Sequence, residues 1–525
     1  MMHSPLTPEF DVLVHALLKK WHVPGMSVAV IDGSKTFSKG YGIAEYPDTK
    51  MTPDTLFYMA STTKAFTAAA MSLVINDRND RNDRNNHHGG NSTKMATTAG
   101  QIHWRTPLAS IIRDDFVLKD EYTTAQITIE DALSHRSGIP DHIHHYGGTG
   151  ASPGSIKDAV RILRYLPATA ELRTKYMYNN LMYTAVSHAI ETLTGENLGT
   201  FLLHRVWAPL HMASTYWTRD DAQAGDNILA QGYAWNANKS EYTPEPCPDI
   251  IGGSGAGAMI SSVVDYARWI RCMMTCSGPL SKSAHSALIQ PRTIIAEDPT
   301  NMFPGTHLYA LGWTRDNYHG EDIIWHDGSV AGYGCTMMYL PRRQWGLVMA
   351  GNTTLTSNIV QVVLYMHLLD QVLGIPSHDR VDWQRQISER IATWRERQAH
   401  AKDLLYPGLP VVQIPPTLGV WEYAGLYEHP GYGRLELEFR VDIDGFRLVA
   451  DRLTCEVPIV ILIEHVSGEF WLASLRERNQ DPRDHERVRA EFRIGVNGSV
   501  CEVGIDLEPE MNGEKIWFQR TDLDM

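Results

Sequence analysis

Residues 56–71 constrain this chain most, because they join a short apolar run to an alanine-rich helical run through one serine and one lysine. Ser61 precedes Lys64 by three positions, and a helix turns once in about 3.6 residues, so the two side chains share a face. A serine hydroxyl is a poor nucleophile until a base removes its proton. A lysine in a dry cleft can be that base, since desolvation disfavours the ammonium. The segment therefore predicts a buried helix that begins at a candidate nucleophile.

A Ser-x-x-Lys match alone is weak evidence, because an N-cap serine followed by a solvated lysine gives the same pattern. Here a second motif, Tyr178-Asn179-Asn180, lies downstream. A phenol has a reference pKa of about 10, so Tyr178 becomes a base only if a cation such as Lys64 lowers that pKa. The Asn180 amide can accept from Lys64 and donate to a substrate carbonyl. A packed tyrosine and a turn-capping asparagine are the structural alternative.

A third motif completes an ordered set: Ser61-x-x-Lys64, then Tyr178-x-Asn180, then His326-x-Gly328. With it, the chain resembles the serine β-lactamase and penicillin-binding-protein superfamily, in particular the class C β-lactamase, D-peptidase and esterase branch. The resemblance covers roughly the first 370 residues. It implies an α+β fold, with an antiparallel sheet flanked by helices and an all-helical subdomain. It also implies that Tyr178 serves as base in acylation and as acid toward the leaving group.

The motif His326-Asp327-Gly328 bears on substrate choice. Glycine at position 328 lets a substrate lie close to the strand backbone. The resemblance implies that the backbone N–H groups of Ser61 and Ser329 form an oxyanion hole, where each donor is worth about 3 kcal/mol. His326 stands where class C β-lactamases usually carry lysine, and Asp327 would repel a substrate carboxylate unless a cation pairs with it. We expect neutral esters, thioesters or amides to be preferred over β-lactams, with His326 lining the site.

Three functions stay open from the sequence. The first is a serine hydrolase or acyltransferase that works through an acyl-enzyme, because hydrolysis and transfer differ only in what attacks that intermediate. The second is a β-lactamase or D-amino-acid peptidase. The third is a non-catalytic relative that uses the cleft as a binding or scaffold module, although three intact motifs disfavour it.

Composition limits the partners. The chain has 525 residues with 47 basic and 61 acidic side chains, a net charge of −14 that disfavours nucleic acid and anionic membranes as partners. The N-terminus lacks a basic segment followed by an apolar core, and no run of about 20 apolar residues would span a membrane. Six scattered cysteines read as reduced thiols of a cytoplasmic protein. We expect no cofactor and no metal, a small-molecule substrate with or without an acyl acceptor, and an oligomeric state that the sequence leaves open.

The predicted organisation is a catalytic domain over residues 1–405, a proline-rich linker over 406–418 and a small lipocalin-like β-barrel over 419–525. Within the first domain, residues 76–103 begin with a three-fold repeat of Asn-Asp-Arg and predict a disordered insertion after the helix. The barrel opens on residues 422–427, which resemble the module appended to many esterases and peptidases of this branch. It could close over the cleft, pair subunits or only stabilise the fold.

Alternation and turn residues predict the individual elements. We expect a helix over residues 9–20, a hairpin of strands 26–31 and 36–41, and a mostly helical stretch over 125–275. Strands are expected at 309–313, 323–326, 334–340 and 345–350, helices at 356–373 and 382–404, and six barrel strands at 435–441, 446–450, 459–463, 470–475, 490–494 and 500–507. Three histidines within residues 141–148 suggest a loop at the rim of the cleft more than a metal site.

Overall fold

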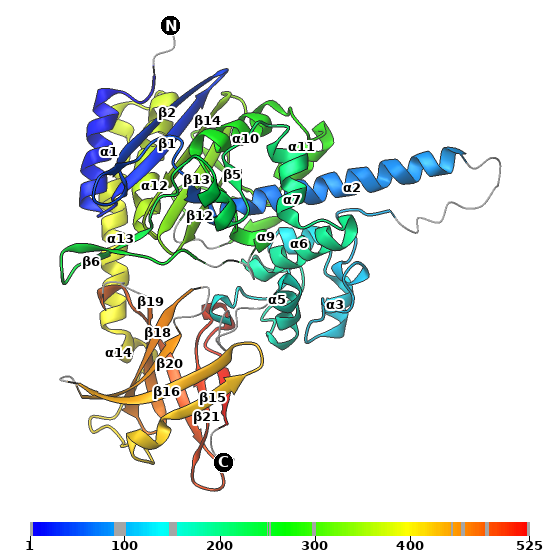
Figure 1. Cartoon of the computed structure of the whole chain (residues 1–525). Coiled ribbons are helices and arrows are strands. Elements are labelled where there is room, and N and C mark those ends of the chain that lie inside the picture. The colour runs from blue at the N-terminus through cyan, green and yellow to red at the C-terminus, as the bar shows by residue number, and fades with distance from the viewer. Residues whose placement is uncertain are drawn as a thin grey trace.

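The computed structural model describes residues 4–88, 101–145, 155–248, 250, 254–296, 301–442, 445–452, 457–477 and 482–521. In this part of the chain a nine-stranded sheet lies between helices, a helical region adjoins it, and a closed eight-stranded barrel follows at the C-terminus (Figure 1). The predicted fold class, an α+β domain followed by a small β-barrel, is confirmed.

The large sheet is antiparallel between neighbouring strands. Its strand order is β3-β2-β1-β14-β13-β12-β11-β10-β9. The strands are β1 (Gly25–Asp32), β2 (Lys35–Glu45), β3 (Thr49–Lys50), β9 (Thr293–Ile295), β10 (His307–Tyr309), β11 (Thr314–Tyr318), β12 (Glu321–Val330), β13 (Tyr333–Leu340) and β14 (Trp345–Gly351). The N-terminal hairpin β1–β2 therefore pairs with the last strand, so the sheet joins segments about 300 residues apart in the chain.

Each face of the sheet is buried under helices, as the period-two pattern of β1 requires. Val28 and Val30 face a core shared with α1 (Pro8–Lys20) and α12 (Thr356–Val372). Ala29 and Ile31 face the opposite core, toward α10 (Val263–Thr275) and the helical region. Burial on both faces accounts for the nearly continuous apolar character of β1.

The strand predicted at residues 309–313 is wrong, because a turn occupies most of that range. β10 ends at Tyr309, β11 begins at Thr314, and Ala310 N donates to Trp313 O at 2.8 Å across the turn. Gly312 has φ +74°, and a Cβ there would lie 2.7 Å from the carbonyl carbon of Lys64. Glycine is needed here both for its conformation and for the close approach of α2. The hairpin and the strands near 334–340 and 345–350 are confirmed.

The predicted disorder of residues 76–103 is also wrong in part. Helix α2 runs over Thr63–His88 and so includes the Asn-Asp-Arg repeats, and its far end projects from the body (Figure 1). Contacts with the body hold the first repeat in the helix: Arg205 binds Asp77 in a bidentate pair at 2.6 and 3.0 Å, and Arg78 donates to Leu193 O at 2.6 Å. Of the rest of the predicted insertion, residues 89–100 lie outside the described residues, and residues 101–103 are irregular with Ile102 buried.

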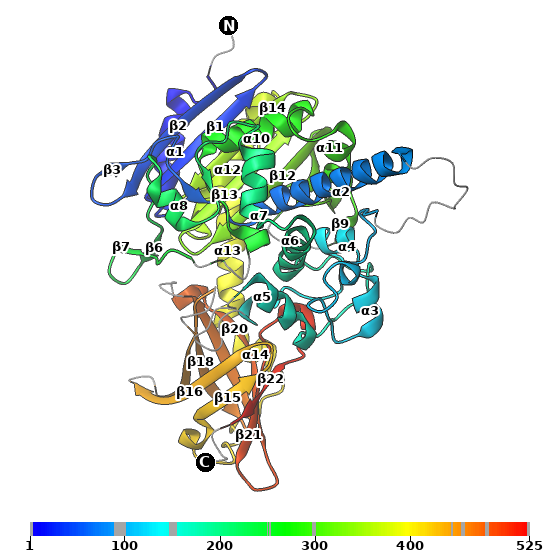
Figure 2. The ribbon, with the colours of Figure 1, turned by 45° about the vertical axis from the view of Figure 1, so that its right-hand side comes forward.

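The barrel contains eight strands, two more than predicted: β15 (Gly425–His429), β16 (Gly433–Asp442), β17 (Gly445–Arg452), β18 (Ile459–Ser467), β19 (Phe470–Glu477), β20 (Glu486–Ile494), β21 (Val500–Ile505) and β22 (Ile516–Arg520). The pairing of β15 with β22 closes it. Helices α13 (Trp383–Ala399) and α14 (Ala401–Leu405) lead from the sheet to the barrel (Figure 2). The sequence predicted a single helix over residues 382–404, whereas the structure has two helices that are separated at His400.

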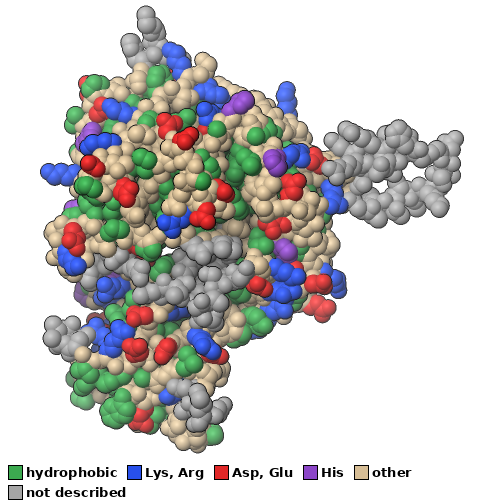
Figure 3. All heavy atoms as spheres, viewed as in Figure 1, with side chains coloured by type: hydrophobic (Ala, Val, Ile, Leu, Met, Phe, Trp, Pro, Cys, Tyr) green, Lys and Arg blue, Asp and Glu red, His purple; other side chains and the backbone are tan. Residues whose placement is uncertain are grey.

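The surface mixes charges of both signs, and acidic and basic side chains are interspersed over the face in Figure 3. Among the described residues, no helix is both long enough and apolar enough to cross a membrane. Cysteines 247, 272, 276, 335 and 501 carry free thiols. Within the part of the chain that the structure describes, no group of three or more His, Cys, Asp or Glu side chains is arranged so that it could hold a metal ion.

Candidate active site

Ser61 lies in a tight turn that the surrounding backbone holds in place. It belongs to the 3₁₀ turn η1 (Ala60–Thr62), between β4 (Phe57–Tyr58) and the start of α2. Met59 N donates to Met259 O at 2.8 Å, and the Cys335 thiol donates to Met59 O at 2.9 Å. Ala60 has φ 43°, an uncommon conformation for a residue with a Cβ. Local strain of this kind persists because neighbouring contacts fix the backbone on both sides.

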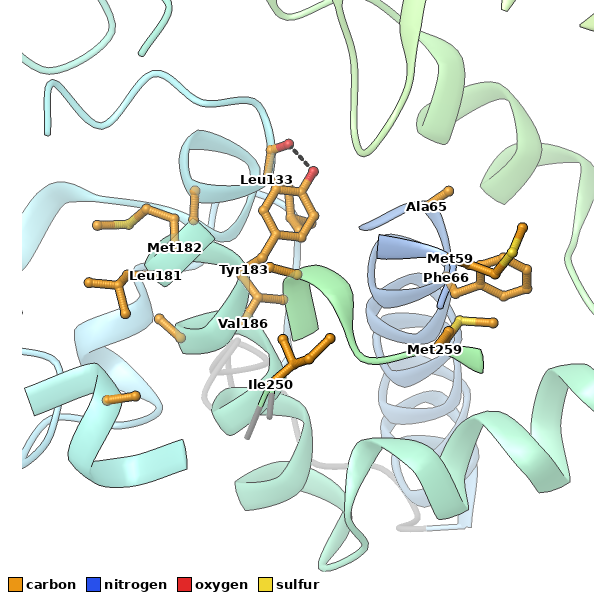
Figure 4. Packing of buried hydrophobic residues seen from close by; sticks show 14 of the residues in the cluster. Met59, Ala65, Phe66, Leu133, Leu181, Met182, Tyr183, Val186, Ile250 and Met259 are labelled. Atoms are coloured by element: carbon orange, nitrogen blue, oxygen red, sulfur yellow. Dashed lines mark hydrogen bonds between the residues drawn. The ribbon is translucent and has the colours of Figure 1, made fainter. Parts of the chain in front are cut away.

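Buried apolar side chains pack around the turn that carries Ser61. Figure 4 shows Met59 and Met259 beside Phe66 of α2, with Leu181, Met182 and Val186 on the neighbouring α6 (Asn180–Thr194). The hydroxyl of Tyr183 donates to Leu133 O at 2.5 Å. Because α2 and α6 are packed through fully buried side chains, the residues at their N-termini have little freedom to separate.

The residues predicted to act on the nucleophile converge on it. Ser61 Oγ accepts from Lys64 Nζ at 3.1 Å and from the Tyr178 hydroxyl at 2.9 Å. Lys64 Nζ also donates to Asn180 Oδ1 at 2.6 Å and to the carbonyl of Ala256 at 3.1 Å. Lys64 and Tyr178 therefore meet at the Ser61 hydroxyl, and Asn180 contacts Lys64 beside it.

Asn180 owes its orientation to Asp141, a residue that sequence reasoning did not place in the site. Asp141 Oδ1 accepts from Asn180 N at 2.8 Å, and its Oδ2 accepts from Asn180 Nδ2 at 3.1 Å. Because the amide nitrogen faces the carboxylate, the amide oxygen faces Lys64. Burial raises the pKa of Asp141 to about 6, against the opposing effects of Asn180 and Lys64.

We expected Lys64 to lower the pKa of Tyr178, but the net shift of that pKa is upward. Burial raises that pKa well above its usual value, the hydrogen bond with Ser61 lowers it in part, and the nearby groups Tyr176, Asp141 and Asp327 raise it further. The Lys64 Nζ atom lies over the Tyr178 ring, 4.7 Å from its centroid. Desolvation of a phenolate here outweighs what one cation supplies. Tyr178 is therefore a neutral phenol that donates to Ser61.

His326 lines the same region as a neutral ring. Its Nδ1 donates to the carbonyl of Asp327 at 2.5 Å, so its Nε2 is the acceptor for the Tyr309 hydroxyl at 2.9 Å. Burial and the charge of Lys64 lower the pKa of His326 to about 3. Both ring nitrogens are thus engaged within the protein, which differs from the expected use of His326 to orient a substrate.

Strand β12 passes against the nucleophile turn at Gly328. A Cβ on Gly328 would lie 2.8 Å from Ser61 N and 2.9 Å from Met59 O, which only glycine avoids. The carbonyl of Gly328 accepts from Asn358 Nδ2 of α12 at 3.0 Å. Asp327 and Ser329, its two neighbours in the strand, are exposed.

A buried aromatic group surrounds Tyr178, and its central member is His135. The His135 ring centroid lies 4.3 Å from that of Tyr178 and 4.7 Å from that of Tyr309. Its Nδ1 accepts from Asn179 N at 3.0 Å, which fixes the peptide directly after Tyr178. Burial lowers the pKa of His135 well below its usual value, so the ring is neutral. The sequence offered no chemical pattern for this role.

The match to a known family agrees with this geometry. The model of the family described as Beta-lactamase matches residues 10–362, more than half of the chain. The chain belongs to the Beta-lactamase family. It is a hydrolase of the β-lactamase fold. A second family, described as a domain of unknown function (DUF3471), matches residues 409–520, which include the barrel.

The chain is similar to two curated fungal proteins over nearly its full length. It is 39% identical to the unguisins hydrolase ungD' of Aspergillus campestris over 98% of this chain and 92% of that protein. It is also 39% identical to the unguisins hydrolase ungD of Aspergillus violaceofuscus, over 99% of this chain and 92% of that protein.

Solved structures share the fold at lower identity. The octameric penicillin-binding protein homologue from Pyrococcus abyssi aligns with a TM-score of 0.59 and 19% identity, over 98% of this chain and 99% of that chain. The D-amino acid amidase from Ochrobactrum anthropi SV3 aligns with a TM-score of 0.51 and 20% identity, over 70% of this chain and 98% of that chain.

Proposed function

We propose that this chain is a serine hydrolase that forms an acyl-enzyme at Ser61 and releases the acyl group to water. The observation that carries the proposal is the pair of hydrogen bonds to one oxygen, from Lys64 Nζ at 3.1 Å and from the Tyr178 hydroxyl at 2.9 Å. A nucleophile whose base and acid both lie within hydrogen-bond distance is the arrangement that acyl transfer requires.

In the first half-reaction Ser61 Oγ attacks the acyl carbon, and its proton passes to the lone pair of Lys64 Nζ, which acts as a neutral amine and becomes an ammonium. Lys64 is the proposed base because the raised pKa of Tyr178 keeps the phenol protonated. When the tetrahedral intermediate collapses, Tyr178 gives its proton to the leaving nitrogen or oxygen and regains one from Lys64. The short contact of Lys64 with Asn180 Oδ1 keeps the amine directed at both partners.

The backbone N–H groups of Ser61 and Ser329 are the proposed oxyanion donors. The tight approach of Gly328 to Ser61 N supports this pairing. Asn358 Nδ2 bridges the carbonyls of Gly328 and Cys335, residues paired across β12 and β13, so the Gly328 carbonyl faces β13. A trans peptide is planar, so the N–H of Ser329 points the opposite way, to the edge beyond the end of the β11 pairing.

We propose an amide, ester or thioester of a neutral small molecule as substrate. The two relatives at 39% identity are named unguisins hydrolases, and unguisins are therefore the first compounds to try. The neutral ring of His326 supplies no cation for a substrate carboxylate. Water is the proposed acceptor, and an added amine or alcohol that captures the acyl group would indicate acyl transfer instead.

Intact-mass spectrometry tests the proposal. The protein is mixed with unguisins and with a panel of neutral esters, thioesters and amides, and quenched within one turnover. The expected result is a covalent adduct that maps to Ser61 and decays as product appears, with none in Ser61→Ala. A folded protein that gives neither an adduct nor product with any compound, and that a fluorophosphonate does not label, would be a non-catalytic relative.

A further inference from the structure

Two separate groups of the barrel bond to His142 of the catalytic region. Glu508, just before the turn η9 (Pro509–Met511), accepts from His142 N at 2.7 Å. Tyr432, in the turn between β15 and β16, bonds to His142 Nδ1 at 2.7 Å. His142 Nε2 faces the carbonyl of Pro167 at 3.0 Å and must donate to it, so Tyr432 is the donor to Nδ1.

These contacts are buried and closely packed. His142 and Tyr432 are fully buried, and Glu508 is 5% exposed. Beside them, a Cβ on Gly431 would lie 3.0 Å from Leu166 Cδ2, so the barrel turn rests directly on the catalytic region. His142 itself has φ 49°, a conformation that a residue with a Cβ keeps only when its surroundings hold it.

His142 directly follows Asp141, whose carboxylate accepts both N–H groups of Asn180. Residues 140–145, which we call the His142 loop, are therefore held by the barrel on one side. On the other side they set the amide that contacts Lys64 at 2.6 Å. A displacement of His142 would move Asp141, release the Asn180 amide and free the Lys64 amine to turn away from Ser61.

The contact between the barrel and the His142 loop also brings acidic groups near each other. Asp141 faces Lys64 and Tyr178 on the catalytic side, and Glu508, Glu510 and Tyr432 on the barrel side. Burial and the charge of Asp141 raise the pKa of Glu508 to about 7. Two carboxyl groups that repel each other are a poor choice for attachment alone.

A separate ion pair fastens the barrel elsewhere. Arg395 of α13 binds Asp484 of the turn η8 (Pro482–Asp484) in a bidentate pair at 2.5 and 2.7 Å. This contact holds the barrel on the connecting helix without touching the His142 loop. It therefore offers a matched control, because its loss would loosen the junction without changing the groups bonded to His142.

We propose that Glu508 and Tyr432 of the barrel are positioning residues for Ser61 acylation, because they hold His142 and so fix the Asp141–Asn180–Lys64 arrangement. This proposal rests on the proposed function. It assigns the barrel a part in the reaction without placing it in contact with the substrate. A small probe that is too short to reach the barrel should therefore still respond to changes at residue 508.

The experiment measures the second-order rate at which a small fluorophosphonate labels Ser61, by intact mass, in the full-length protein. Glu508→Ala removes the acceptor of His142 N and should label at least about tenfold more slowly, since a misplaced catalytic group commonly loses that much. Glu508→Gln keeps an oxygen acceptor and should stay within about threefold of wild type. Tyr432→Phe keeps the ring but loses the hydroxyl, and its labelling rate should lie between those of Glu508→Ala and Glu508→Gln. Asp484→Asn should label at the wild-type rate.

Wild-type labelling by Glu508→Ala, or equal slowing in Asp484→Asn, would overturn the positioning role while leaving the proposed function intact. Equal slowing of Glu508→Gln and Glu508→Ala would also overturn it, because the acceptor would not be what matters. If Glu508→Ala fails to fold, judged by its melting curve, Tyr432→Phe decides: wild-type labelling then rejects the proposal. A wild-type protein that forms no adduct at any pH would overturn the proposed function and this proposal with it.

Discussion

Lys64 and Tyr178 both reach Ser61 Oγ, but burial makes them unequal as bases. The phenol keeps its proton because its pKa is raised well above the usual value, so the amine is left to accept the serine proton. Lys64→Arg stays protonated near neutral pH, so it cannot accept the serine proton, and it should lower the acylation rate by about 10³. Single-turnover adduct formation measures this, with a melting curve as control. If Lys64→Arg acylates within tenfold of the wild-type rate, a group other than Lys64 must be the base.

Tyr178 should matter in proportion to the leaving group, because its proposed part in the acyl transfer is to donate a proton. Tyr178→Phe should lower the rate on an anilide by about 10² to 10⁴. On a p-nitrophenyl ester of the same acyl group the loss should be at most about tenfold, since nitrophenolate leaves without a proton. The ratio of the two rates is the measurement. An equal loss on both substrates would assign Tyr178 to the attack on the carbonyl instead.

Asp141 should set a pH dependence. Its two oxygens accept two N–H groups from Asn180, which an ionised carboxylate does better than a protonated one. Burial raises the pKa of Asp141 to about 6, so acylation should fall as the pH drops through about 6 and level off above it.

The matched variant for this prediction is Asp141→Asn. Its side chain does not titrate, and its NH₂ group would oppose one donor of Asn180. The variant should acylate at least about tenfold more slowly at neutral pH, with no step near pH 6. Labelling rates from about pH 5 to about pH 8 in both proteins measure this. An unchanged step near pH 6 in the variant would assign that step to a different group.

At the scale of elements, the sequence predicted what local pattern encodes. Apolar or alternating runs bounded by turn residues placed the hairpin β1–β2 and the strands β13 and β14, and the Ser61 segment placed a helix start. Two predictions failed where distant contacts decide. Residues 309–313 form a turn because Gly312 packs against α2, and the polar repeats stay helical where Asp77 pairs with Arg205. Asp141 was missed because its partner Asn180 lies 39 residues further along the chain.

The contact of β12 with the nucleophile turn gives a prediction at this scale. Gly328→Ala would place a Cβ 2.8 Å from Ser61 N, so either the strand or the turn must shift. Because both proposed oxyanion donors flank this contact, acylation should fall by about 10² to 10³. The control is Gly257→Ala, whose Cβ would meet the same turn at an ordinary 3.7 Å from Ala60.

Both glycine variants are compared by labelling rate and by melting temperature. Gly257→Ala should label within about threefold of wild type, since an ordinary van der Waals contact requires no shift of the turn. If Gly328→Ala labels at the same rate as Gly257→Ala, the contact between β12 and the nucleophile turn does not orient the oxyanion donors.

For the whole molecule, charge should select among substrates. The chain carries a net charge of −14, and Asp327 and Asp141 both act on Tyr178 within the site. The ring of His326 is neutral, so it does not offset them. An ester that bears a carboxylate should therefore be hydrolysed less efficiently than a neutral ester with the same leaving group. At low ionic strength we expect a difference in kcat/KM of about tenfold.

The dependence of kcat/KM on salt concentration distinguishes this electrostatic effect from a difference in how the two esters fit the site. The Debye length falls from about 30 Å at 0.01 M to about 3 Å at 1 M salt, so kcat/KM of the anionic ester should rise with added salt. The neutral ester should change by less than about twofold, since it carries no charge to be screened. Asp327→Asn should narrow the gap between the two esters at low salt, because it removes one repelling charge. Equal rates for both esters at low salt, or rapid turnover of the anionic β-lactam nitrocefin, would show that the site tolerates a substrate carboxylate despite the two acids beside Tyr178.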